Sequence, residues 1–202
     1  MTHEEHHDPE GARMGMWLFL FTEFLIFGGM FIAYFMYLLR YEKQFAHASH
    51  EGLSQITGTL NTLVLITSSL TVALAIGAIE RGRRAAAMAF VGVTIALAVV
   101  FFVIKAGEWG GKFAHGIRPG TAEWTAMAAG ERMFYTMYFT LTGMHGLHVL
   151  IGAGILMGCL WMIRSGAISQ RRPIVLENTG LFWHLVDLIW IFLFPLFYLI
   201  GK

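Results

Sequence analysis

Residues 85–104 read AAAMAFVGVTIALAVVFFVI, an apolar segment that carries no charge between Arg84 and Lys105. A helix of about 20 residues crosses the roughly 30 Å hydrocarbon core of a bilayer, so this segment is long enough to span a membrane. Four further apolar segments occupy residues 14–39, 52–79, 133–163 and 178–201. The sequence therefore predicts an all-α, polytopic transmembrane bundle of five helices.

The composition agrees with this fold class. The chain has 202 residues, of which 56% are hydrophobic and only 13% are charged, against roughly 25% charged residues in soluble domains. Its net charge of +1 gives no reason to expect nucleic-acid binding. We expect an acidic, His-rich tail at residues 1–13 and a single membrane domain at residues 14–202, with helices at about residues 14–39, 57–79, 85–106, 133–163 and 178–200.

The basic residues suggest an orientation for the bundle. Seven of them fall on the side of the N-terminus and seven on the other side. The first set is concentrated in two short connections, residues 80–84 and 164–172, whereas the second is spread over longer loops. Positive charge in short loops is the stronger signal for a cytoplasmic location. We therefore expect the N-terminus in the cytoplasm and the C-terminus on the opposite side.

Ionisable side chains inside the apolar segments are the main candidates for function, because they are costly in lipid and usually face a protein interior. In the last segment, His184 and Asp187 are three residues apart and share a helix face, where they could bond to each other. Two interpretations stay open. The pair either ties this helix to its neighbours or takes part in a reaction.

Glu23 is the only charged residue of the first segment. Desolvation favours the neutral form of a carboxyl, so we expect Glu23 to be buried and largely protonated unless a histidine or water holds its charge. A protonated carboxyl either donates a hydrogen bond to another helix or relays a proton. The sequence does not choose between these roles.

His145 and His148 also share a helix face. A haem or metal site that combines them with His184 or Glu23 is an alternative, but no further carboxylate-rich helix would complete a di-metal site. The single cysteine, Cys159, cannot form an internal disulfide or an iron–sulfur cluster. We expect no cofactor and no metal on this chain, with Cys159 as a small core residue.

Four residues at helix ends are expected to contact the membrane interface or lipid. Lysine and tryptophan commonly anchor a helix at the level of the lipid headgroups, which predicts this role for the segment 105–109. An acidic residue suits the first turn of a helix, where it and Asn178 fit a cap. The four residues are Lys105, Glu108, Trp109 and Glu177.

Five stretches carry a resemblance to a known family, in the family's order and over all five expected helices. They are residues 17–31 around Glu23, 61–71, 105–109, 143–152 with both histidines, and 177–195 with the pattern Trp-His-x-x-Asp-x-x-Trp. On these residues the chain resembles subunit III of haem–copper terminal oxidases, the cytochrome c oxidase subunit III family, in its short five-helix bacterial form.

The resemblance implies an accessory, non-catalytic subunit of a respiratory oxidase in the bacterial cytoplasmic (inner) membrane. Haem and copper would then belong to the partner, catalytic subunit I. Family members bind phospholipids within the bundle, support proton uptake and protect the dioxygen-reducing site from inactivation. The counterpart of Glu23 is a buried carboxyl that reacts with hydrophobic carbodiimides. We expect the same properties here.

Three alternatives remain at this stage. Two lie close to the family: subunit III of a quinol oxidase and the accessory subunit of a nitric-oxide reductase, because nothing in the sequence identifies the electron donor. The third is an independent proton-coupled transporter that uses Glu23, His148 and Asp187. Internal repeats would favour a transporter, but the five unequal segments show none.

Overall fold

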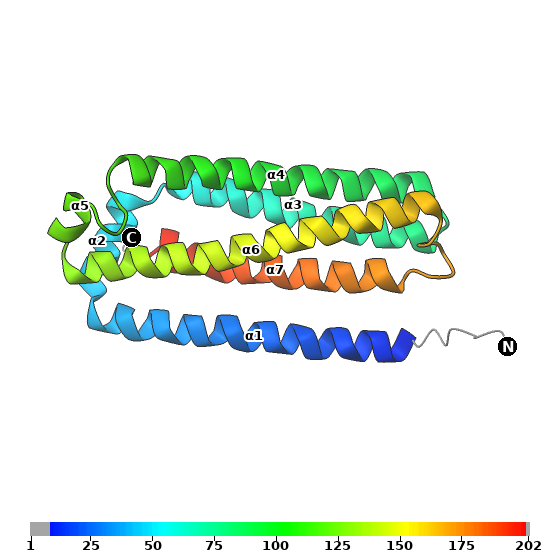
Figure 1. Ribbon diagram of the computed structural model, residues 1–202, viewed down its shortest axis with the longest axis horizontal. Helices are drawn as coiled ribbons and strands as arrows, with labels where there is room; N and C mark the ends of the chain where they lie inside the picture. The colour runs from blue at the N-terminus through cyan, green and yellow to red at the C-terminus, as the bar shows by residue number, and fades with distance from the viewer. Residues whose placement is uncertain (1–8, 201–202) are drawn as a thin grey trace.

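The computed structural model describes residues 9–200. Every named element in this range is a helix, and the order is α1 (Pro9–Arg40), α2 (Glu42–Gly52), α3 (Gln55–Glu80), α4 (Arg84–Ala114), α5 (Ala122–Ala126), α6 (Ala129–Ser165) and α7 (Ile174–Tyr198) (Figure 1). Within the same residues, five helices are long and apolar enough to cross a membrane, namely α1, α3, α4, α6 and α7. The five predicted spans are therefore confirmed.

The helix boundaries differ from the prediction where the chain leaves the apolar segments. Helix α4 continues to Ala114 instead of ending near residue 106, and α7 begins at Ile174 instead of residue 178. The N-cap of α7 is Pro173, so Glu177 and Asn178 lie inside the helix and do not cap it, although Glu177 lies in the first turn as predicted. The short helices α2 and α5 were not expected, because their sequences are polar.

The predicted tail is also shorter, since residues 9–13 already belong to α1. The His-rich part of the tail, at residues 1–8, lies outside the described residues.

Four of the long helices form a closed ring. Helix α3 packs against α4 and α7, and α6 packs against the same two helices. Helix α1 lies outside this ring, along the edge formed by α6 and α7, and makes no comparable contact with α3 or α4 (Figure 1). Helices α2 and α5 lie at the end of the bundle where α7 finishes. The site residues therefore lie either inside the ring or between the ring and α1.

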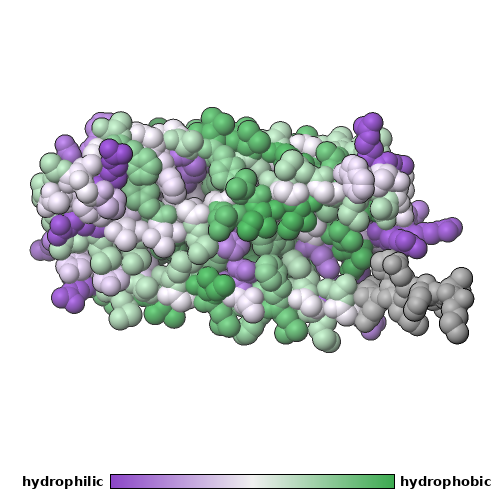
Figure 2. Space-filling model, in the orientation of Figure 1, coloured by the Kyte–Doolittle hydropathy of each residue, from purple (hydrophilic) through white to green (hydrophobic). Residues whose placement is uncertain are grey.

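The surface is that of a membrane bundle. Large apolar side chains such as Trp17, Leu39 and Trp161 are exposed. Figure 2 shows a hydrophobic middle, with hydrophilic residues gathered mainly at the two ends. This arrangement places the apolar band at the depth of the hydrocarbon core, where exposed apolar side chains meet lipid.

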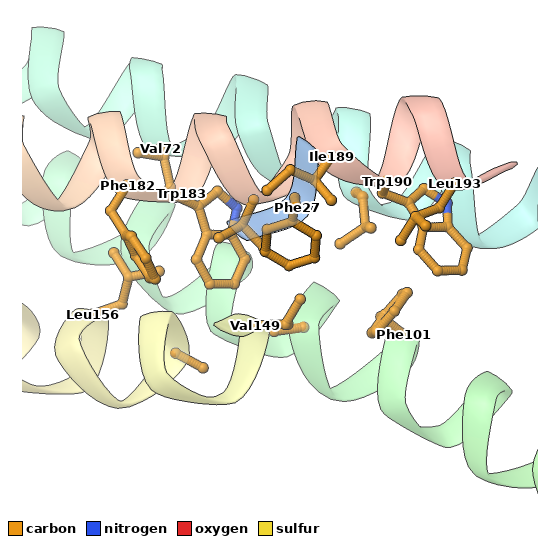
Figure 3. Close-up of a cluster of buried hydrophobic side chains, with 14 of the residues drawn as sticks. Phe27, Val72, Phe101, Val149, Leu156, Phe182, Trp183, Ile189, Trp190 and Leu193 are labelled. Carbon is orange, nitrogen blue, oxygen red and sulfur yellow. The ribbon is translucent and has the colours of Figure 1, made fainter. Parts of the chain in front are cut away.

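The core is built around the aromatic side chains of α7. Trp183 and Trp190 are fully buried and lie among Phe101 of α4 and Val149 of α6 (Figure 3). Glycine makes this packing possible on α6, because a Cβ atom at Gly152 would lie 2.9 Å from the Trp183 ring. Close approach of backbone to side chain is the usual reason for glycine at helix contacts in membranes, where dispersion contacts drive association.

Candidate functional site

Glu23 on α1 and His148 on α6 form a buried pair. The Oε2 atom of Glu23 lies 2.8 Å from Nε2 of His148, and the two side chains are only 11% and 12% exposed. The rings of Phe27 and Phe182 lie beside the imidazole and complete an apolar enclosure. The sequence singled out both residues but did not predict that they pair, because 125 positions separate them.

The second hydrogen bond of His148 limits where the proton of this pair can be. Its Nδ1 atom lies 2.8 Å from the carbonyl oxygen of Met144. A carbonyl only accepts, so Nδ1 carries a hydrogen and Nε2 alone faces Glu23. Either a protonated carboxyl donates to Nε2, or an imidazolium donates to the carboxylate. In both forms one proton lies between Glu23 and His148, so the geometry forms a proton-holding pair.

His184 and Asp187 are not bonded to each other in the described part of the chain. Each is instead connected to serines of α3. The Oγ atom of Ser69 is 2.5 Å from Nδ1 of His184, and the Ser68 hydroxyl donates to Oδ2 of Asp187 over 3.4 Å. The Trp183 indole also donates to the Ser68 oxygen, at 3.0 Å. The two side chains thus join α7 to α3, which favours their role as connections between helices.

His145 is fully buried, and within residues 9–200 neither ring nitrogen has a hydrogen-bond partner. Its ring lies between Phe101 and Trp190, with centroid separations of 5.6 Å and 5.1 Å. Sharing a helix face with His148 therefore does not bring the two histidines to a common partner.

Lys105 and Glu108 form an ion pair inside the ring, at 3.2 Å. The Lys105 ammonium also donates to the hydroxyls of Tyr138 and Tyr198, at 3.1 Å and 2.7 Å. Those hydroxyls in turn donate to Oε1 of Glu108, at 2.6 Å and 2.8 Å. Both side chains are therefore buried in the protein and do not lie at its membrane surface as expected, whereas their predicted contact with lipid stays a prediction. A buried ammonium needs charged and polar partners, and α4, α6 and α7 supply them inside the bundle.

The other two predicted interfacial residues also have protein partners. The Trp109 ring packs edge-on against Phe139, with centroids 5.3 Å apart. Glu177 accepts a hydrogen bond from Arg13 over 2.7 Å, and this ion pair ties the start of α7 to the start of α1. Cys159 is buried, as predicted, and lies beside Thr179.

The residues proposed as a metal or haem site do not converge. Glu23 pairs with His148, His145 lies among aromatic rings, and His184 faces α3. Among residues 9–200, no group of three or more His, Cys, Asp or Glu residues is placed to hold a metal ion.

Two cavities flank the Lys105–Glu108 pair. One of about 660 Å³ is lined by Glu108, Lys112 and Tyr135 together with the end of α2 and the start of α3. The other, of about 380 Å³, lies between α4 and α6 and is mainly apolar, with Phe102, Gly143 and Leu147 in its wall. Such a groove has the size and the polarity to accept part of a lipid chain.

Comparison with known proteins assigns the family. The family model for cytochrome c oxidase subunit III matches residues 2–202. The chain is 30% identical to cytochrome bo(3) ubiquinol oxidase subunit 3 of Pseudomonas aeruginosa, over 98% of this chain and 90% of that protein. It is also 30% identical to cytochrome c oxidase subunit 3 of Thermostichus vulcanus, over 98% and 91%. The subunit 3 of Gallus gallus is 29% identical, over 100% and 75%.

The chain belongs to the cytochrome c oxidase subunit III family. The predicted resemblance is therefore confirmed, and the chain is an accessory subunit III of the haem–copper terminal oxidases. This membership places it in a multi-subunit respiratory oxidase, embedded in a membrane by the five long helices described here.

Several residues of the polar network were not singled out from the sequence. Tyr138 and Tyr198 complete the surroundings of Lys105, while Ser68 and Ser69 hold the polar pair of α7. The tyrosines gave little signal, because aromatic residues are frequent in four of the five spans, α3 being the exception. The serines belong to a run of small hydroxyl residues at positions 67–69, which equally suits close helix packing.

Proposed function

We propose that this subunit III carries no redox centre and supports a catalytic subunit by two means: a rigid polar framework and a protected proton at Glu23. The observation that carries this proposal is that buried ionisable side chains form bonds between helices. Glu23, Lys105 and Asp187 each bond to a group on a neighbouring helix, and these bonds join α1 to α6, α4 to α6 and α7, and α7 to α3.

The haem and copper of the oxidase would then lie on the catalytic subunit I. The transporter alternative is less well supported, because Asp187 faces α3 whereas Glu23 and His148 meet at the interface of α1 and α6. We also propose that phospholipid occupies the apolar groove between α4 and α6, since its wall offers aromatic and aliphatic contacts.

The proposed location is the cytoplasmic membrane of a bacterium, with the N-terminus in the cytoplasm. The support for this orientation is the concentration of arginines in the connections α3–α4 and α6–α7, on the side where α1 begins.

Two electron donors fit the comparisons equally well. One relative is named as a subunit of a ubiquinol oxidase and another as a subunit of a cytochrome c oxidase, both at 30% identity. We therefore propose a role in either type of oxidase, with the donor bound by another subunit.

The experiment is purification of the chain from its native membrane through an affinity tag. We expect haem to co-purify, with an absorption spectrum of a terminal oxidase, and either ubiquinol or reduced cytochrome c to support oxygen consumption. A tag on an unrelated membrane protein of the same strain is the control. Intact chain that purifies alone, without haem, would refute the proposal.

A further inference from the structure

One face of α7 looks out of the bundle between α1 and α3. Leu181, His184, Leu188 and Ile191 follow each other at helical spacing on this face, and Leu188 and Ile191 are 47% and 44% exposed. On one side α1 contributes Phe24 and Phe31 to a groove of about 240 Å³ that also includes Leu188. On the other side stands Ser69 of α3. We call this outward face of α7, which lies between α1 and α3, the α7 trough.

His184 is a polar group in the middle of this apolar trough. It lies ten residues after the start of α7 and fourteen before its end, so about 15 Å of helix separates it from the nearer end. The imidazole is only partly buried. Its Nδ1 atom meets Ser69, whereas no bond of Nε2 is found within residues 9–200. With a hydrocarbon core of about 30 Å, a position about 15 Å from the helix end falls near the middle of the membrane, where an acyl chain is the expected neighbour of an exposed group.

An unpaired polar nitrogen that faces hydrocarbon is costly, because an acyl chain has no group that could bond to it. Ionisable side chains in membrane spans therefore almost always face protein or a water-filled cavity. The outward face of α6 offers a contrast. Its exposed residues Leu147, Leu150 and Ile151 are all apolar and need nothing but lipid.

We infer that the α7 trough is a docking surface for a transmembrane helix of another subunit of the same oxidase. That helix would place a hydrogen-bonding group against Nε2 of His184, while its apolar side chains pack on Leu188, Phe24 and Phe31. This inference rests on the proposed function, because it requires a membrane-embedded partner. It assigns the partner to one face of the bundle.

Photo-crosslinking in the native membrane tests the assignment. The amino acid p-benzoylphenylalanine replaces Leu188 in the trough and, as a matched control, Leu147 on α6, since these leucines are 47% and 50% exposed. We expect irradiation to join position 188 to another oxidase subunit and position 147 to lipid alone. Three results would each overturn the inference. The first is a crosslink from position 188 to a second copy of this chain. The others are the absence of any crosslink from position 188 to another subunit, and a crosslink to another subunit from position 147 that is as strong or stronger.

A second measurement addresses His184 directly. We expect His184→Phe to lower the amount of this chain retained on the oxidase after detergent extraction several-fold, and His184→Gln, which keeps an amide that can hydrogen-bond, to restore most of it. Equal retention of both variants would contradict a hydrogen bond across the trough. The haem content of the purified complex shows which proposal has failed. If haem co-purifies but position 188 gives no crosslink, only the docking face is refuted. If no haem co-purifies, the proposed function is refuted.

Discussion

At the scale of single residues, the bundle limits the cost of several buried ionisable groups by giving them fixed partners, whereas His145 has none among residues 9–200. Glu23 meets His148, and Lys105 meets Glu108 and two tyrosine hydroxyls. Removing one member of such a buried pair typically destabilises a protein by about 3–5 kcal/mol, because the other member stays buried without compensation. The pairs therefore fix how the helices are positioned, and one shared proton lies between Glu23 and His148.

Carbodiimide labelling tests the state of Glu23. A hydrophobic carbodiimide reacts with the acid form of a carboxyl, so we expect it to modify Glu23 and to leave Glu23→Gln unmodified at this position. His148→Leu removes the nitrogen that shares the proton, which favours the neutral acid in its apolar enclosure, and labelling should become faster. Mass spectrometry of the labelled peptide measures the rate.

Two outcomes would contradict this account of the pair. One is labelling of Glu23→Gln at the rate of the parent protein, which would locate the reactive carboxyl elsewhere. The other is slower labelling in His148→Leu, which would mean that the imidazole is needed to activate the carboxyl. Glu51→Gln, at an exposed carboxylate near the bundle end, serves as the control and should leave the rate unchanged.

Sequence reasoning found most of the residues of the site but not their partners. The positions of Glu23, His148 and Asp187 inside apolar segments were visible, since hydropathy is a local property. Their partners come from other helices, and helical spacing alone suggested a bond between His184 and Asp187 that the structure replaces with bonds to Ser69 and Ser68. The prediction for Lys105 was wrong for a related reason. A lysine near the end of a span commonly extends its ammonium group to the membrane surface, whereas Lys105 is buried.

At the scale of helices, apolar length predicted the spans but not their ends. Helices α4 and α7 extend past the apolar segments into polar turns, where backbone hydrogen bonding continues without a hydrophobic signal. Glycine at position 166 adopts a left-handed conformation, with φ of 87°, and ends α6 as expected for a C-cap. At contacts between helices, glycine has a different role, because its missing side chain leaves room for a residue of the neighbouring helix.

Gly152 and Gly154 provide a matched pair for testing helix packing. A Cβ atom at Gly152 would lie 2.9 Å from Trp183 and 3.2 Å from Phe182, whereas Gly154 has nothing within 4 Å. Overpacking of a tight contact typically costs about 1–3 kcal/mol. Gly152→Ala should therefore lower the temperature at which this subunit unfolds, measured in the detergent-solubilised oxidase complex. Gly154→Ala should leave it unchanged or raise it slightly. The reverse order would show that α6 and α7 pack differently.

At the scale of the whole molecule, the ring of four helices and the separate α1 suggest how the subunit acts. Helix α1 is held to the ring at three levels: by Arg13 and Glu177 near its start, by Glu23 and His148 in the middle, and by the Tyr34 hydroxyl, which donates to the carbonyl of Leu196, towards its end. Such a framework can brace a partner subunit from outside without contributing an electron carrier.

The central claim, that subunit III supports the oxidase without taking part in electron transfer, is tested by the time course of oxygen consumption per haem. The oxidase is purified with this chain and after its selective removal by detergent. The account predicts the same initial rate in both preparations, followed by faster loss of activity during turnover in the depleted one. An initial rate that falls in proportion to the chain removed, with haem content unchanged, would contradict it.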